Sequence, residues 1–155
     1  DHASAYRERA TAYAQELREV DAYIHERVAE LDPDRRILIT SHDAFGYFGE
    51  MYGFEVRGLQ GISTATEAGT SDVQELAQFV ADRRIPAMFV ESSVPPRGIE
   101  AVREAVRARG FEVRIGGTLY GDALGGPGSG ADTYVGMVRA NIDTIVEGLT
   151  ETAPS

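Results

Sequence analysis

The 155-residue sequence contains no lysine, no cysteine and no tryptophan. Without lysine the chain cannot carry a phosphate-binding G-x-x-x-x-G-K-[ST] loop or a Schiff-base lysine. Without cysteine it cannot form disulfides, thiolate metal sites or cysteine nucleophiles. Long apolar runs are also missing, since runs such as 37–39 and 87–90 are far too short to span a bilayer. These absences exclude several classes of enzyme and any membrane-spanning helix.

Basic residues are scarce as well. The chain has 15 basic residues, all arginine, against 25 acidic residues, which gives a net charge of −10. A chain this acidic repels nucleic acid and anionic lipid, so we expect no nucleic-acid partner, but it does not repel cations. The length fits one domain. The chain starts at Asp1 with neither methionine nor a signal peptide, and we expect it to be a mature or trimmed form.

Residues 1–31 are predicted to form one long helix. Their apolar side chains recur every three or four positions and form a single stripe: Tyr6, Ala10, Tyr13, Leu17, Val20, Ile24, Val28 and Leu31. Pro33 ends the pattern. At 1.5 Å per residue the helix would be about 45 Å long, more than one small domain requires. We therefore expect the far end of the stripe, at Tyr6, Ala10 and Tyr13, to be exposed and to support self-association.

After Pro33, short β-branched runs alternate with helical segments. Strands are predicted over 36–40, 54–58, 87–91 and 111–116. Helices are predicted over 44–52, onward from a capping box at Ser71 and Gln74, over 99–109, and from an Asp132 cap to 149. The alternation predicts an α/β fold, a small doubly wound sheet of four parallel strands with helices on both faces. We divide the chain into a long helix, 1–32, and an α/β lobe, 33–155.

Three residues at the predicted strand ends could carry chemistry, because ligands of such sheets bind beyond the carboxyl ends of the strands. His42 is expected at the start of a helix, facing an open cleft, and Asp122 follows the fourth strand. One imidazole and one carboxylate at this edge would make half of a divalent-metal site, which needs about four ligands. Glu91 could be a ligand, accept a hydrogen bond from His42, or pair with an arginine, and the last two roles are favoured. Structural roles for His42 and Asp122 stay open, and His25 is expected to be solvated.

A set of short motifs appears in a fixed order along the chain: 41–48 (SHDAFGYF), 52–53 (YG), 62–64 (IST) with Glu67, 89–93 (FVESS), 122–125 (DALG), 133–137 (TYVGM) and 141–142 (NI). Together they resemble the carboxy-terminal half of the cluster A-I, or TroA-like, family. These proteins are the extracytoplasmic solute-binding subunits of ABC importers for zinc and manganese. The resemblance runs from about residue 4 to residue 150, and the set is specific although each motif alone is weak.

The resemblance implies one lobe of a two-lobed metal receptor, in which a long helix joins the lobes and the metal lies between them. By motif, His42 matches the third of four metal ligands and Asp122 the fourth. The other two, both histidines, would come from an amino-terminal lobe that this chain lacks. A non-enzymatic protein in the periplasm, or lipid-anchored on the extracytoplasmic face, is implied, with an ABC permease as partner and zinc or manganese as cargo. With two of four ligands, this chain alone should bind metal weakly or not at all.

Two other classes of function stay open. A small metal-assisted hydrolase could use His42, Asp122 and Glu91, but it would need an open coordination position and a positioned base. A ligand-free α/β module could use its acidic surface to dock a partner. The residues do not name the metal either, because histidine with carboxylate suits zinc, manganese and iron, although the usual order of affinities favours zinc.

Overall fold

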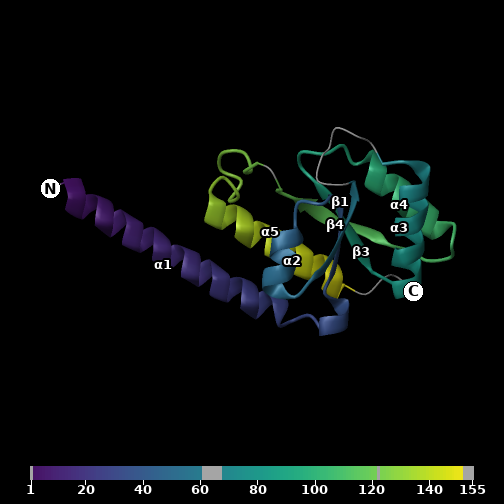
Figure 1. Ribbon diagram of the computed structural model, residues 1–155, viewed down its shortest axis with the longest axis horizontal. Helices are drawn as coiled ribbons and strands as arrows, with labels where there is room; N and C mark the ends of the chain where they lie inside the picture. Colours follow the sequence, from purple (N-terminus) through teal and green to yellow (C-terminus); the bar gives the residue numbers. More distant parts are fainter. Residues whose placement is uncertain (1, 61–67, 122, 152–155) are drawn as a thin grey trace.

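The computed structural model describes residues 2–60, 68–121 and 123–151. Helix α1 (His2–Val28) extends away from the body of the molecule as a single rod (Figure 1). Only its carboxy-terminal part is covered, where Val20, Ile24 and Val28 are buried. The helix ends three residues before the predicted boundary, and Pro33 begins the short 3₁₀-helix η1 (Pro33–Arg35).

The exposed half of α1 is apolar on one side, as the sequence predicts. Tyr6 is 72% exposed and Tyr13 is 48% exposed, and Ala10 between them is exposed as well. No helix among the described residues is both long and apolar enough to cross a membrane.

The strands form two parallel pairs, β1 (Ile37–His42) with β2 (Glu55–Gln60) and β3 (Ala87–Glu91) with β4 (Arg114–Leu119). Strands β1 and β3 lie next to each other, so the order is β2-β1-β3-β4. The predicted α/β fold with parallel strands is confirmed. One continuous hydrogen-bonded sheet of four strands is not observed. In the described part of the chain, strand-to-strand hydrogen bonds join β1 to β2 and β3 to β4, and none joins β1 to β3.

Helices cover both faces of the strands, which makes the lobe doubly wound (Figure 1). Helices α1, α2 (Gly46–Tyr52) and α5 (Tyr134–Thr150) share one core with Leu38 and Phe89. Helices α3 (Thr70–Arg83) and α4 (Arg97–Arg107) share the other core with Ile39 and Met88. Neighbouring residues of β1 and β3 thus enter opposite cores, since successive side chains of a strand point to opposite faces. This explains why these strands are apolar throughout.

Several predicted boundaries are wrong by one to three residues. The fourth strand covers 114–119 rather than 111–116, because Phe111 follows the turn at Gly110 (φ +83°) and packs into the α3–α4 core. Helix α5 is capped by Thr133, not Asp132: the Thr133 hydroxyl accepts a hydrogen bond from Gly136 N–H at 3.1 Å. Similarly, the N-cap of α3 is Gly69, whose N–H donates to Asp72 Oδ2 at 2.8 Å, so the expected box at Ser71 and Gln74 is not the cap.

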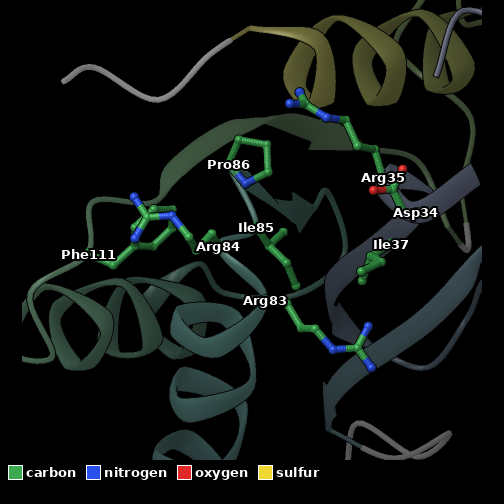
Figure 2. Close-up of a pocket in the computed structure, with 8 residues that line it drawn as sticks. All are labelled: Asp34, Arg35, Ile37, Arg83, Arg84, Ile85, Pro86 and Phe111. Carbon is green, nitrogen blue, oxygen red and sulfur yellow. The ribbon is translucent and has the colours of Figure 1, made fainter. Parts of the chain in front are cut away.

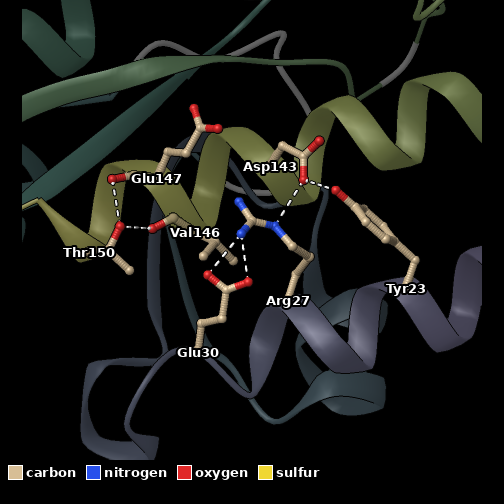
Figure 3. A network of polar contacts seen from close by, with 7 residues as sticks. All are labelled: Tyr23, Arg27, Glu30, Asp143, Val146, Glu147 and Thr150. Atoms are coloured by element: carbon tan, nitrogen blue, oxygen red, sulfur yellow. Dashed lines mark hydrogen bonds and ion pairs between the residues drawn. The ribbon is translucent and has the colours of Figure 1, made fainter.

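Polar side chains join the carboxy-terminal part of α1 to α5 (Figure 3). The Tyr23 hydroxyl donates to Asp143 Oδ1 at 2.5 Å, and Arg27 Nε donates to the same oxygen at 3.0 Å. Arg27 also pairs with Glu30 at 2.6 Å. We call Tyr23, Arg27 and Asp143 the α1–α5 anchor. Together with the buried residues Val20, Ile24 and Val28, it holds α1 on the lobe.

Candidate metal centre

His42 is the last residue of β1 and is only 3% exposed. The sequence-based expectation of a helix-start residue facing an open cleft is therefore wrong, because β1 continues two residues beyond the predicted end and α2 begins only at Gly46. The main chain is still paired at His42, whose strand partner is Gln60. The imidazole accordingly belongs to the rigid edge of the sheet rather than to a loop.

Glu91 lies directly against His42. Its Oε2 atom is 2.8 Å from His42 Nδ1 and also accepts a hydrogen bond from the main-chain N–H of His42 at 2.8 Å. Glu91 ends β3, so these contacts join the carboxyl ends of the two central strands. The side chains are 4% and 0% exposed. A carboxylate in this position accepts a hydrogen bond from Nδ1–H, and in that tautomer the ring's lone pair is on Nε2.

The main chain of His42 is held as tightly as its side chain. Its carbonyl oxygen accepts hydrogen bonds from the Thr40 hydroxyl at 2.8 Å and from Ala44 N–H at 2.9 Å. Gly58 of β2 passes so close that a Cβ atom there would lie 2.7 Å from His42 C and 2.6 Å from Asp43 N. The sequence analysis did not single out Thr40 or Gly58, whose only signals are a hydroxyl and a glycine within predicted strands.

Asp122 lies outside the described residues, so its expected position beside His42 stays a prediction. The residues before it are described. Tyr120 N–H donates to Asn141 Oδ1, and Asn141 Nδ2 donates to Tyr120 O, both at 2.9 Å. At Gly121, a Cβ atom would lie 2.7 Å from Glu91 Oε1. The chain that leads to Asp122 thus runs over the buried carboxylate that contacts His42.

This donor set is incomplete as a metal site. Among the residues that the structure describes, no three His, Asp or Glu side chains are grouped to hold a metal ion. His25, on α1, has a side chain that is 58% exposed and lies 3.8 Å from Asp21, which confirms the expectation that it is solvated. An imidazole whose Nδ1 is oriented by a carboxylate is the usual form of a metal-binding histidine, so His42 fits the role of one ligand.

Two pockets in the described part of the chain are lined by neither His42 nor Glu91. A pocket of about 380 Å³ lies at the opposite ends of the strands and is lined by Arg35, Arg83 and Arg84. Their guanidinium groups point away from one another, and Arg84 stacks over Phe111 at 5.0 Å, so they do not converge on a ligand (Figure 2). An apolar groove of about 450 Å³ lies between α1, α2 and α5 and reaches Gly121.

The fold and the His42–Glu91 pair together define the class of this protein: a doubly wound α/β lobe with a carboxylate-oriented histidine at the carboxyl ends of its central strands. Comparison with known proteins identifies it further. The chain belongs to the ZnuA family, described as zinc-uptake complex component A, periplasmic, whose sequence profile matches residues 1–148.

Sequence and structural similarity to characterised metal-binding proteins supports the same family. The chain is 55% identical over 144 residues to the zinc-binding protein TroA of Treponema pallidum, covering 93% of this chain and 47% of that protein. It is 46% identical over 148 residues to the manganese-binding lipoprotein MntA of Bacillus subtilis, covering 96% and 48%. The structure of the periplasmic zinc-binding protein TroA from Treponema pallidum superimposes with a TM-score of 0.92 at 54% identity, covering 94% of this chain and 53% of that one. The chain therefore spans about half the length of these relatives.

Proposed function

We propose that this chain is the carboxy-terminal half of an extracytoplasmic receptor that delivers zinc or manganese to an ABC permease in the membrane. In this role it binds and releases metal without chemical conversion. The relatives named for zinc and manganese support the class of cargo. The acidic net charge of −10 also favours a cationic ligand.

The observation that carries this proposal is the contact of His42 Nδ1 with the buried Glu91 carboxylate at 2.8 Å. The carboxylate fixes the ring, selects the tautomer and makes Nε2 a stronger donor toward a metal ion. His42 is then a direct ligand, and Glu91 orients it without contacting the metal. Asp122 is the second ligand of this half, by its motif, and two histidines of the other half complete the four.

The geometry disfavours the hydrolase alternative. A metal-assisted hydrolase needs a base that can reach a bound water. Glu91 is the candidate acidic residue that contacts His42, and its side chain is 0% exposed and held by two contacts to His42. A carboxylate enclosed in this way orients the imidazole but does not approach a water molecule in the cleft.

Calorimetric titration with zinc and with manganese tests the proposal. In the two-lobed receptor, His42→Ala should abolish tight binding, and Glu91→Gln should weaken it about 10- to 100-fold, as loss of a group that orients a ligand typically does. His25→Ala, at an exposed histidine of the same chain, is the matched control and should bind like wild type. In the 155-residue chain alone, binding should be weak. Undiminished affinity in His42→Ala would refute the assignment, provided that circular dichroism shows a folded protein.

A further inference from the structure

A buried amide on α5 is bound to the main chain next to the metal centre. Asn141 is 7% exposed and sits among the apolar residues that α5 buries. Its side chain makes two hydrogen bonds, both 2.9 Å, with the N–H and the C=O of Tyr120. The ladder between β3 and β4 ends one residue earlier, at the pair Glu91 and Leu119. The amide of Asn141 therefore replaces a neighbouring strand at the point where the chain leaves the sheet.

The next residue closes the site over Glu91. A Cβ atom at Gly121 would lie 2.7 Å from Glu91 Oε1 and 3.6 Å from the Ala44 side chain. Gly121 thus brings main chain, without a side chain, into contact with the carboxylate. The Glu91 side chain is 0% exposed, and the segment at Gly121 is part of what shields it.

From this arrangement we infer that Asn141 is a positioning residue for the His42–Glu91 pair. By holding Tyr120 at both main-chain polar groups, Asn141 keeps Gly121 over Glu91 and excludes water from the carboxylate. In a dry site the hydrogen bond between Glu91 Oε2 and His42 Nδ1 is electrostatically stronger than it would be in water. Asn141 therefore acts on His42 through the main chain of Tyr120 and Gly121 and then through Glu91. The consequence for metal affinity rests on the proposed function, whereas the effect on the pair does not.

The test compares two variants that loosen this arrangement with one that does not. Asn141→Leu is similar in size and removes both hydrogen bonds to Tyr120. Gly121→Ala leaves α5 intact and pushes a Cβ atom toward Glu91, so it decides the matter if Asn141→Leu fails to fold. Ile142→Val is the control, because Ile142 is fully buried on the same helix and its truncation lowers stability without removing a hydrogen bond.

The primary measurement is the NMR signal of the His42 imidazole in the metal-free 155-residue chain. A protected Nδ1 proton, shifted downfield by the carboxylate, is expected in wild type and in Ile142→Val. In Asn141→Leu and Gly121→Ala this signal should shift upfield or be lost through exchange with water. A merely structural asparagine would lower the melting temperature and leave the His42 signal of the folded protein unchanged, and that result would overturn the inference.

Cobalt titration of the two-lobed receptor is the second measurement. Affinity should fall about 10- to 100-fold in Asn141→Leu and Gly121→Ala and stay at the wild-type value in Ile142→Val. A wild-type receptor that binds neither zinc nor manganese would refute the proposed function. The NMR result would still decide the role of Asn141, so the two failures can be told apart.

Discussion

Replacing His42 by alanine should destabilise the lobe even without metal. The substitution removes an imidazole that is 4% exposed and leaves the fully buried Glu91 carboxylate with one contact fewer. The main-chain N–H of residue 42 still donates to Glu91 Oε2. A hydrogen bond to a charged group contributes about 1.5–3 kcal/mol, and the lost ring leaves a void. We expect the free energy of unfolding to fall by about 2–4 kcal/mol.

A double-mutant cycle with Glu91→Gln isolates the contact between the two side chains. Glutamine keeps an acceptor oxygen of similar reach but loses the charge, so this variant should also be less stable than wild type. If the two side chains interact as their 2.8 Å separation indicates, the double variant should lose about 1–2 kcal/mol less than the sum of the single losses. Variants at distant sites would instead add to within about 0.5 kcal/mol.

Urea unfolding followed by far-UV circular dichroism measures each corner of the cycle, in the presence of a chelator. His25→Ala is the control, and its side chain is 58% exposed, so its loss should stay within about 0.5 kcal/mol. The reasoning is refuted if His42→Ala is as stable as this control, or if the cycle is additive. Either result would mean that the imidazole is free to leave Glu91, as it would be on the surface of an open cleft.

Three further predictions concern other parts of the lobe. Gly58→Ala should destabilise by about 1–3 kcal/mol in urea unfolding, because its Cβ atom meets main chain, whereas Gly126→Ala has open space around it and should be neutral. Burial and the hydrogen bond to an aspartate raise the pKa of Tyr52 above its ordinary value of 10.0. The contribution of the Tyr52 hydroxyl to stability is therefore complete below pH 10 and is lost as the pH rises through the folded-state pKa. Above pH 10, the free energy of unfolding should fall more steeply with pH in wild type than in Tyr52→Phe. Equal slopes of the unfolding free energy against pH in the two proteins would contradict this. Finally, light scattering should show concentration-dependent dimers that are lost when Tyr6 and Tyr13 are both replaced by aspartate, and a wild-type monomer at all concentrations would exclude self-association through α1.

The sequence predicts the layers of this fold well because each layer rests on a local pattern. The apolar stripe of α1 and the apolar run of β3 depend only on spacing and side-chain type. Strand ends are less predictable, because pairing with a neighbour decides them. β1 continues to His42 since β2 offers Gln60 as a partner, and no residue near His42 in sequence reveals this.

At the candidate site, the sequence predicts that His42 and Glu91 follow neighbouring strands, but it does not predict the geometry of their contact. Position at the strand ends is enough to bring His42 and Glu91 to one edge of the sheet. Their mutual burial depends on segments far away in sequence, including Gly121, and it places His42 in a buried environment where the sequence predicts an open cleft. Asn141 gave a weak signal, as a polar residue on the otherwise apolar buried face of α5. Its partner is main chain, so no pattern of side chains could identify it.

Because the α1–α5 anchor holds only one end of the long helix, a small rotation there moves the free end of the helix by a larger distance. About 21 residues of α1 lie beyond Tyr23, which at 1.5 Å per residue is an arm of about 30 Å. A rotation of about 5° at the anchor would displace the far end of such an arm by about 2.7 Å. That displacement exceeds a metal–ligand bond length of about 2.0–2.3 Å for zinc. In the proposed receptor, whose ligands come from two halves, the contacts that hold the base of α1, the α1–α5 anchor among them, would limit how far the two halves of the metal site can shift apart.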